Sequence, residues 1–111
     1  LKKRGSLFVA VPNYNSYDSL LYKEYWASLD VPRHLYHFTP QTMEVLTHEY
    51  RLKIKEIKPM VFDSYYVSIL SDSYIRKGNN IINSIINGYL SNKKAKKNNN
   101  YSSLLFILKK I

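Results

Sequence analysis

The sequence predicts a small α/β domain of three strands and about four helices, in the order strand-helix-helix-strand-helix-helix-strand. Two apolar runs that do not alternate, Leu7–Val11 and Leu104–Leu108, are typical of strands covered on both faces. A third run, Leu52–Lys58, alternates apolar residues with lysines and ends at Pro59, as protected edge strands do. The segments between these runs carry helical spacing or helix-capping residues. A chain of 111 residues has room for one domain with a modest core.

The first two helices are expected between the first and second strands. Cap-type residues near Ser16 predict a helix over about residues 17–26. The positions at helical spacing that we expect to face inward are Tyr17, Leu20, Leu21 and Tyr25. Thr39 and Pro40 predict the next helix start, with Thr39 as N-cap and Pro40 at the first helical position. Its predicted inward face comprises Met43, Leu46 and Tyr50.

The other two helices are expected between the second and third strands. Asp63 is a suitable cap for the first of them and Gly78 for its end. The positions of this helix that we expect to face inward are Tyr66, Ile69 and Leu70. In the next segment apolar residues recur almost every fourth position, at Ile81, Ile82, Ile85, Ile86, Tyr89 and Leu90. We interpret this amphipathic helix as packed into the core, in preference to a face for a membrane or a partner.

The three predicted strands do not fit equally well into one sheet. Only one strand of a three-stranded sheet can be central, yet two of these strands are apolar throughout. The first strand carries no charge between Ser6 and Asn13, so it lacks the protection that edge strands usually have. We therefore expect the neighbour of Leu7–Val11 to lie outside this chain.

Composition limits the other classes of function. The chain has no cysteine, which excludes disulfides and cysteine metal sites, and no apolar leader, so we expect a cytoplasmic protein. The net charge of +9 raises nucleic acid and anionic membranes as partners. The lysines are scattered, however, and the one dense group lies in the asparagine-rich stretch Asn92–Asn100, predicted as a loop. We therefore expect neither nucleic acid nor a membrane as the main partner.

Three segments resemble the C-terminal half of class I S-adenosylmethionine-dependent methyltransferases, closest to the broad group that contains the ubiquinone-biosynthesis type. They are "LKKRGSLFVAVPN", "YWASLDVPRHLYHFTPQTMEVL" and "YSSLLFILKK", and together the resemblance covers nearly the whole chain. The second segment, with its D-x-P-R-H-L-x-H-F-S/T-P pattern, is the most specific of the three. Lys3 and Arg4 replace the family's usual Pro and Gly, a departure that affects the turn into the first strand.

The resemblance implies a partial Rossmann-like sheet. It makes Leu7–Val11 the family's fifth strand, Leu52–Lys58 the sixth, and Ser103–Leu108 the seventh, which is antiparallel and central in the order 5-7-6. Residues 1–111 would then be one partial domain, the acceptor-side half of an enzyme that methylates a small molecule. The glycine-rich turn that holds S-adenosylmethionine is not among Gly5, Gly78 and Gly88, so we expect no cofactor binding and no activity from this chain alone. The alternative is a free-standing module that forms a homo-oligomer through strand 7–11.

The resemblance also implies an acceptor site beyond the first strand, bordered by the loop after it. His34 or His37 could take the proton of an acceptor hydroxyl, and Arg33 could hold an anionic acceptor. Asn13 and Trp26 complete the candidate substrate-binding set. The structural alternative is that Asp30 pairs with Arg33 and that the histidines contact backbone carbonyls around the prolines. We expect no metal site, because His-x-x-His in a loop bracketed by prolines is not a typical ligand spacing.

Overall fold

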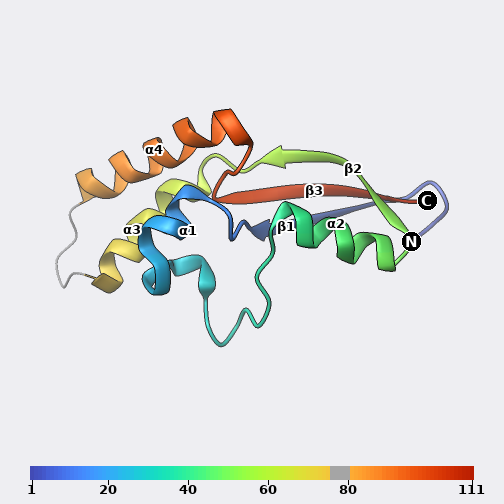
Figure 1. Cartoon of the computed structure of the whole chain (residues 1–111), viewed down its shortest axis with the longest axis horizontal. Coiled ribbons are helices and arrows are strands. Elements are labelled where there is room, and N and C mark those ends of the chain that lie inside the picture. Colours follow the sequence, from blue (N-terminus) through green and yellow to red (C-terminus); the bar gives the residue numbers. More distant parts are fainter. Residues whose placement is uncertain (76–80) are drawn as a thin grey trace.

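The sheet contains three strands, β1 (Ser6–Pro12), β2 (Leu52–Pro59) and β3 (Ser103–Lys110), in the order β1-β3-β2. These elements come from a computed structural model that describes residues 1–75 and 81–111. Strand β3 runs antiparallel to both neighbours, as Figure 1 shows. The prediction of a central last strand beside a lysine-bearing edge strand is confirmed. The α/β class with four helices is confirmed as well.

Helix α2 (Pro40–Glu49) covers one face of this sheet. It starts as predicted, because the Thr39 side chain accepts a hydrogen bond from the Thr42 amide and Pro40 occupies the first turn. Met43 packs against a buried group on the central strand that consists of Leu104, Phe106 and Leu108. Tyr50, predicted to face inward, is exposed instead. It lies beyond the last turn of α2, where the chain turns at Arg51 (φ 54°) into β2.

Strand β1 is only partly covered by the rest of the described chain. Leu7 is 41% exposed and Phe8 is 61% exposed, so the prediction that both faces are covered is wrong for this chain. The physical reason is that only one face of β1 is packed: Val9 and Val11 contact the core that includes Met43 of α2, whereas Phe8 points to the opposite face and is exposed. Along its edge, β1 has β3 on one side and no strand of the described residues on the other. A neighbour outside the chain stays a prediction, and the open edge agrees with it.

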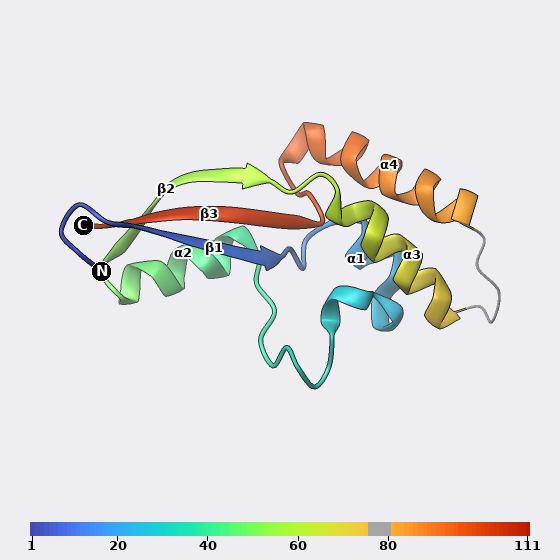
Figure 2. The ribbon, with the colours of Figure 1, turned by 180° about the vertical axis from the view of Figure 1, so that it is seen from behind.

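The other helices form a second region beyond one end of the sheet. This helical region consists of α1 (Tyr17–Tyr22), the 3-10 turns η1 (Lys23–Tyr25) and η2 (Ala27–Leu29), α3 (Asp63–Ile75) and α4 (Ile81–Asn98). Figures 1 and 2 show these helices at one end of the molecule and both chain termini at the other. The radius of gyration is 15.1 Å, whereas a compact domain of this length has about 13 Å. The molecule is therefore elongated, with the sheet at one end and the helical region at the other.

Helix α1 is shorter than predicted and turns a different face inward. It ends at Tyr22, because Lys23 adopts φ 52°, a backbone conformation that does not continue a helix. Leu20 and Leu21 are exposed, contrary to the prediction. The buried residues of α1 are Asp18, Ser19 and Tyr22. A buried carboxylate thus replaces the expected apolar contact.

Helices α3 and α4 pack against each other through small side chains. The buried residues of α4 are Ser84, Gly88, Ser91 and Ala95, and those of α3 are Ser64, Val67, Ser68, Ser71 and Asp72. The predicted inward face of α4 is exposed at Ile81, Ile82, Ile85, Ile86 and Tyr89, so the interpretation as a core-packed apolar face is wrong. Tyr66 of α3 is also exposed, whereas Gly78 lies outside the described residues.

The close contact at Gly88 explains why the small residues of α4 are buried and its isoleucines are exposed. A Cβ atom at Gly88 would lie 2.9 Å from the Cα atom of Tyr65, so the two helices leave no room for a larger side chain. Residues on the opposite side of α4 must then face away from α3. Of the helices within residues 1–75 and 81–111, none is both long enough and apolar enough to cross a bilayer.

Candidate functional site

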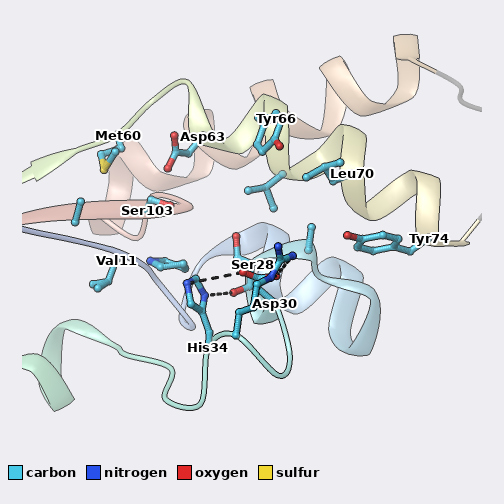
Figure 3. Close-up of a pocket in the computed structure, with 15 residues that line it drawn as sticks. Val11, Ser28, Asp30, His34, Met60, Asp63, Tyr66, Leu70, Tyr74 and Ser103 are labelled. Atoms are coloured by element: carbon cyan, nitrogen blue, oxygen red, sulfur yellow. Dashed lines mark hydrogen bonds and ion pairs between the residues drawn. The ribbon is translucent and has the colours of Figure 1, made fainter.

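A cavity of about 450 Å³ lies where the sheet region meets the helical region. Three parts of the chain line it: the end of β1 with the start of β3, the loop after η2, and one side of α3, as Figure 3 shows. The residues that these parts contribute include Val11, Pro12, Ser103, Asp30, Arg33, His34, Asp63, Tyr66 and Leu70. Its walls combine apolar surface with both signs of charge, which suits an amphipathic small molecule.

The loop that bears Arg33 and His34 is fixed by its own short contacts. Asp30 ends η2 in the left-handed conformation (φ 44°, ψ 45°), and its backbone carbonyl accepts a hydrogen bond from the His34 amide at 2.9 Å. The Asp30 side chain accepts a hydrogen bond from Arg33 Nε at 2.8 Å. The predicted Asp30–Arg33 pair is therefore present. It holds the loop in a turn that presents His34 to the cavity.

The contacts of His34 favour one tautomer of its ring. Nδ1 lies 3.4 Å from the backbone carbonyl oxygen of Ser28, and Figure 3 shows this contact at the rim of the cavity. A carbonyl oxygen can only accept, so Nδ1 is the donor and in the neutral ring Nε2 carries the lone pair. Nε2 lies 3.9 Å from Asp30 Oδ2, too far for a hydrogen bond. Nε2 is therefore available to accept a proton from a ligand.

Arg33 is the cation closest in sequence to this histidine, and it too lines the cavity. Both Nε and Nη2 of Arg33 contact the same oxygen of Asp30. The guanidinium therefore does not form the bidentate pair, with one nitrogen on each carboxylate oxygen, that is the strongest arrangement. Its side chain is 81% exposed. An exposed pair of this kind contributes little stability and can open when an anionic ligand competes for the guanidinium.

Three other predicted site residues do not line this cavity. Trp26 is 2% exposed and its Nε1 donates to Asp18 Oδ2 at 2.9 Å. Asn13 is buried, where its side chain donates to Asn100 Oδ1 and accepts from the Asn15 amide. The His37 ring stacks on the Tyr14 ring, with 6.1 Å between the two ring centroids. The structure thus brings Arg33 and His34 to one site, whereas Asn13 and Trp26 form hydrogen bonds elsewhere and His37 stacks on Tyr14.

Two buried carboxylates in the helical region were not singled out from the sequence. Asp18 accepts hydrogen bonds from Trp26 Nε1, from Ser91 Oγ at 3.0 Å and from Ser102 Oγ at 2.6 Å. It thereby joins α1, α4 and the start of β3. No local motif marks it, because its partners lie up to 84 residues away in the sequence.

Asp72 is the second of these carboxylates and links the helices in the same way. Its Oδ2 accepts from Tyr22 at 3.2 Å and from Ser84. Burial raises the pKa of Tyr22 above its ordinary value, an effect opposed by the hydrogen bond that Asn87 donates to the Tyr22 hydroxyl. In residues 1–75 and 81–111 no group of three or more metal-ligating side chains comes together. Each of the two carboxylates accepts hydrogen bonds from side chains of at least two other segments of the chain.

Comparison with known proteins does not assign the chain to a family. No family model matches it, and no curated protein and no solved structure matches either.

Proposed function

We propose that this chain is the acceptor-side portion of an S-adenosylmethionine-dependent methyltransferase that acts on a small molecule. The observation that carries the proposal is the sheet order β1-β3-β2 with an antiparallel central β3 and an unpaired β1 edge. This is the order expected for the fifth, seventh and sixth strands of that enzyme class, and the open edge is where its fourth strand would pair. The cavity at the carboxyl end of β1 lies where ligands bind in open α/β sheets.

The residues of this cavity suit an acceptor and do not suit the cofactor. No glycine occurs among the described residues that line it, so it offers no close backbone approach of the kind a glycine-rich turn provides. His34 Nε2 is placed to accept the proton of an acceptor hydroxyl, and Arg33 to attract an anionic group. The apolar wall formed by Val67 and Leu70 would contact the body of the acceptor. S-adenosylmethionine itself requires residues outside this chain.

The first test is the coding sequence upstream of Leu1 and the protein it encodes. The proposal predicts a glycine-rich turn after an upstream strand, and equilibrium dialysis should detect S-adenosylmethionine bound to the extended protein and none to the 111 residues. An extended protein without such a turn or without cofactor binding would contradict the proposal.

The second test concerns His34 in the extended protein. His34→Asn should lower the rate of methyl transfer about 100-fold or more and leave cofactor affinity unchanged, because it removes only the proton acceptor. His48→Asn changes an exposed histidine of α2 that does not line the cavity, and should have no effect. Equal rates for the two variants would exclude His34 as a proton acceptor.

A second candidate function rests on the same open edge. An unpaired strand with exposed Leu7 and Phe8 can pair with a second copy of the chain, which would make it a dimerising module. Light scattering of the 111-residue chain should then give the mass of a dimer, and Phe8→Lys should give a monomer. Phe62→Lys, at an exposed position beside α3, is the matched control. A folded monomer at high concentration would contradict this candidate.

A further inference from the structure

The outward side of α4 combines apolar and basic residues. Ile82 is 72% exposed, Ile86 is 50% exposed and Tyr89 is 56% exposed. Two helical turns beyond Ile86 the same side of the helix carries Lys93, and one turn later Lys97, both exposed. We call these five residues the outer face of α4. Figure 2 shows α4 at the periphery of the molecule, packed along α3.

This outward orientation is built into the way the two helices pack. The buried side of α4 consists of Ser84, Gly88, Ser91 and Ala95, and α4 packs against both α3 and α1. Ser64 Oγ donates to the Gly88 carbonyl oxygen at 3.2 Å, and Gly88 fits closely against Tyr65. Rotating α4 to bury its isoleucines would break this contact and place bulky side chains in a seam made for small ones. The apolar side is therefore held in water unless something outside the chain covers it.

The charge along α4 indicates what covers it. Its eighteen residues, Ile81–Asn98, include four lysines and no acidic residue. All four lysines are exposed, and Lys94 also lies over the Tyr17 ring at 4.2 Å. The helix is thus apolar in its first half and cationic in its last turns, along one side. That side is complementary to a surface that offers hydrocarbon and negative charge together.

We propose that the outer face of α4 binds the surface of an anionic phospholipid bilayer. The helix lies along the interface, with Ile82, Ile86 and Tyr89 at the boundary of the acyl chains and Lys93 and Lys97 at the lipid phosphates. A nucleic acid would match the lysines and leave the isoleucines in water. The expectation that no membrane is a main partner rested on core packing of these isoleucines and on a lysine group placed in a loop. The isoleucines are exposed, and the lysines lie in α4.

Sedimentation of the 111-residue chain with vesicles tests the proposal without reference to methyl transfer. The chain should bind vesicles of phosphatidylcholine mixed with phosphatidylglycerol much more tightly than pure phosphatidylcholine, and the affinity should fall as NaCl is added. Ile82→Asn with Ile86→Asn should weaken binding about tenfold or more, because the buried apolar area is lost. Lys93→Gln with Lys97→Gln should weaken it about 25-fold, since each lysine near the surface contributes about fivefold.

Matched variants separate this face from the general properties of the protein. Lys53→Gln with Lys55→Gln removes the same charge from exposed positions on β2, and should weaken binding much less than the α4 pair. Leu20→Asn with Val45→Asn replaces two exposed apolar residues on α1 and α2, and should leave binding unchanged. The first control has the same net charge as the α4 lysine variant, and the second removes as many apolar side chains as the α4 isoleucine variant. Each differs from its partner in the position of the substitutions.

A second measurement reports the depth of the helix directly. Tyr89→Trp adds an exposed indole on the outer face of α4, while Trp26 stays buried as a constant background. Its emission should shift to shorter wavelength with anionic vesicles and not with neutral ones. The proposal is overturned if the emission does not shift, or if the α4 variants bind vesicles like their controls. It is also overturned if the isoleucine variants change only the oligomeric state of the protein and not its binding to vesicles.

Discussion

The sheet region and the helical region of this protein differ in how many polar side chains they bury. Beneath α2 the buried group is Met43, Leu104, Phe106 and Leu108, which is entirely apolar. Between α1, α3 and α4 a small apolar group of Tyr22, Trp26 and Val67 lies among many buried serines and two buried carboxylates, Asp18 and Asp72. The first region is stabilised by apolar area removed from water, and the second depends in addition on hydrogen bonds to its buried carboxylates. The two regions should therefore respond to different substitutions.

The largest effect is expected in the sheet region. Phe106→Ala should lower the free energy of unfolding by about 4 kcal/mol, because it leaves a cavity in the apolar core. Urea unfolding followed by circular dichroism measures it. Phe62→Ala removes the same atoms from a side chain that is 82% exposed and should change stability by no more than about 0.5 kcal/mol. Similar losses for the two would show that the apolar core does not dominate this region.

The next effect concerns the buried carboxylate of the helical region. Asp18→Leu should lower the free energy of unfolding by about 3 kcal/mol, because Trp26, Ser91 and Ser102 lose their common acceptor. The fluorescence of Trp26 follows unfolding of this region in urea. Glu24→Gln removes an exposed carboxylate and serves as the control. If Asp18→Leu is as stable as the original chain, apolar contacts and not hydrogen bonds hold this region.

A third prediction concerns Gly88, where helix propensity and packing have opposite effects on stability. Alanine favours a helix interior by about 1 kcal/mol over glycine, yet its Cβ would lie 2.7 Å from Tyr65 Cδ1 and 2.9 Å from Tyr65 Cα. Backbone atoms cannot move aside as a side chain can, so Gly88→Ala should lower the free energy of unfolding by about 1–2 kcal/mol. Thermal unfolding measures the sign. A stabilised variant would mean that α3 and α4 are not held as closely as the seam of small residues requires.

The smallest effect is a dependence on pH. Because burial raises the pKa of Tyr22, the folded protein holds this proton more tightly than the unfolded chain does. The contribution of Tyr22 to stability is therefore present below its ordinary pKa of 10.0 and is lost as the pH rises through the raised value. Urea unfolding from pH 8 to pH 11 should show a smaller loss in Tyr22→Phe than in the original chain. Tyr50→Phe, at an exposed position just after α2, should show the original loss.

The strand pattern could be predicted from the sequence because it follows from short-range properties. Continuous apolar runs and a lysine-bearing run distinguish a central strand from an edge, and Thr39-Pro40 specifies a helix start with residues adjacent in the chain. Of the candidate site, Arg33 and His34 share the cavity for a similar reason. They lie in one turn that the adjacent Asp30 stabilises.

The sequence by itself determined the number, order and edge character of the strands, the capped start of α2 and the apolar stripe of α4. Only the tertiary structure decided which side of each helix is buried. The helical period of 3.6 residues places isoleucines on one side of α4 and small residues on the opposite side. Which of the two sides is buried depends on how closely α3 approaches. Likewise, nothing near Asp18 specifies Ser102, because chain folding alone brings these residues together.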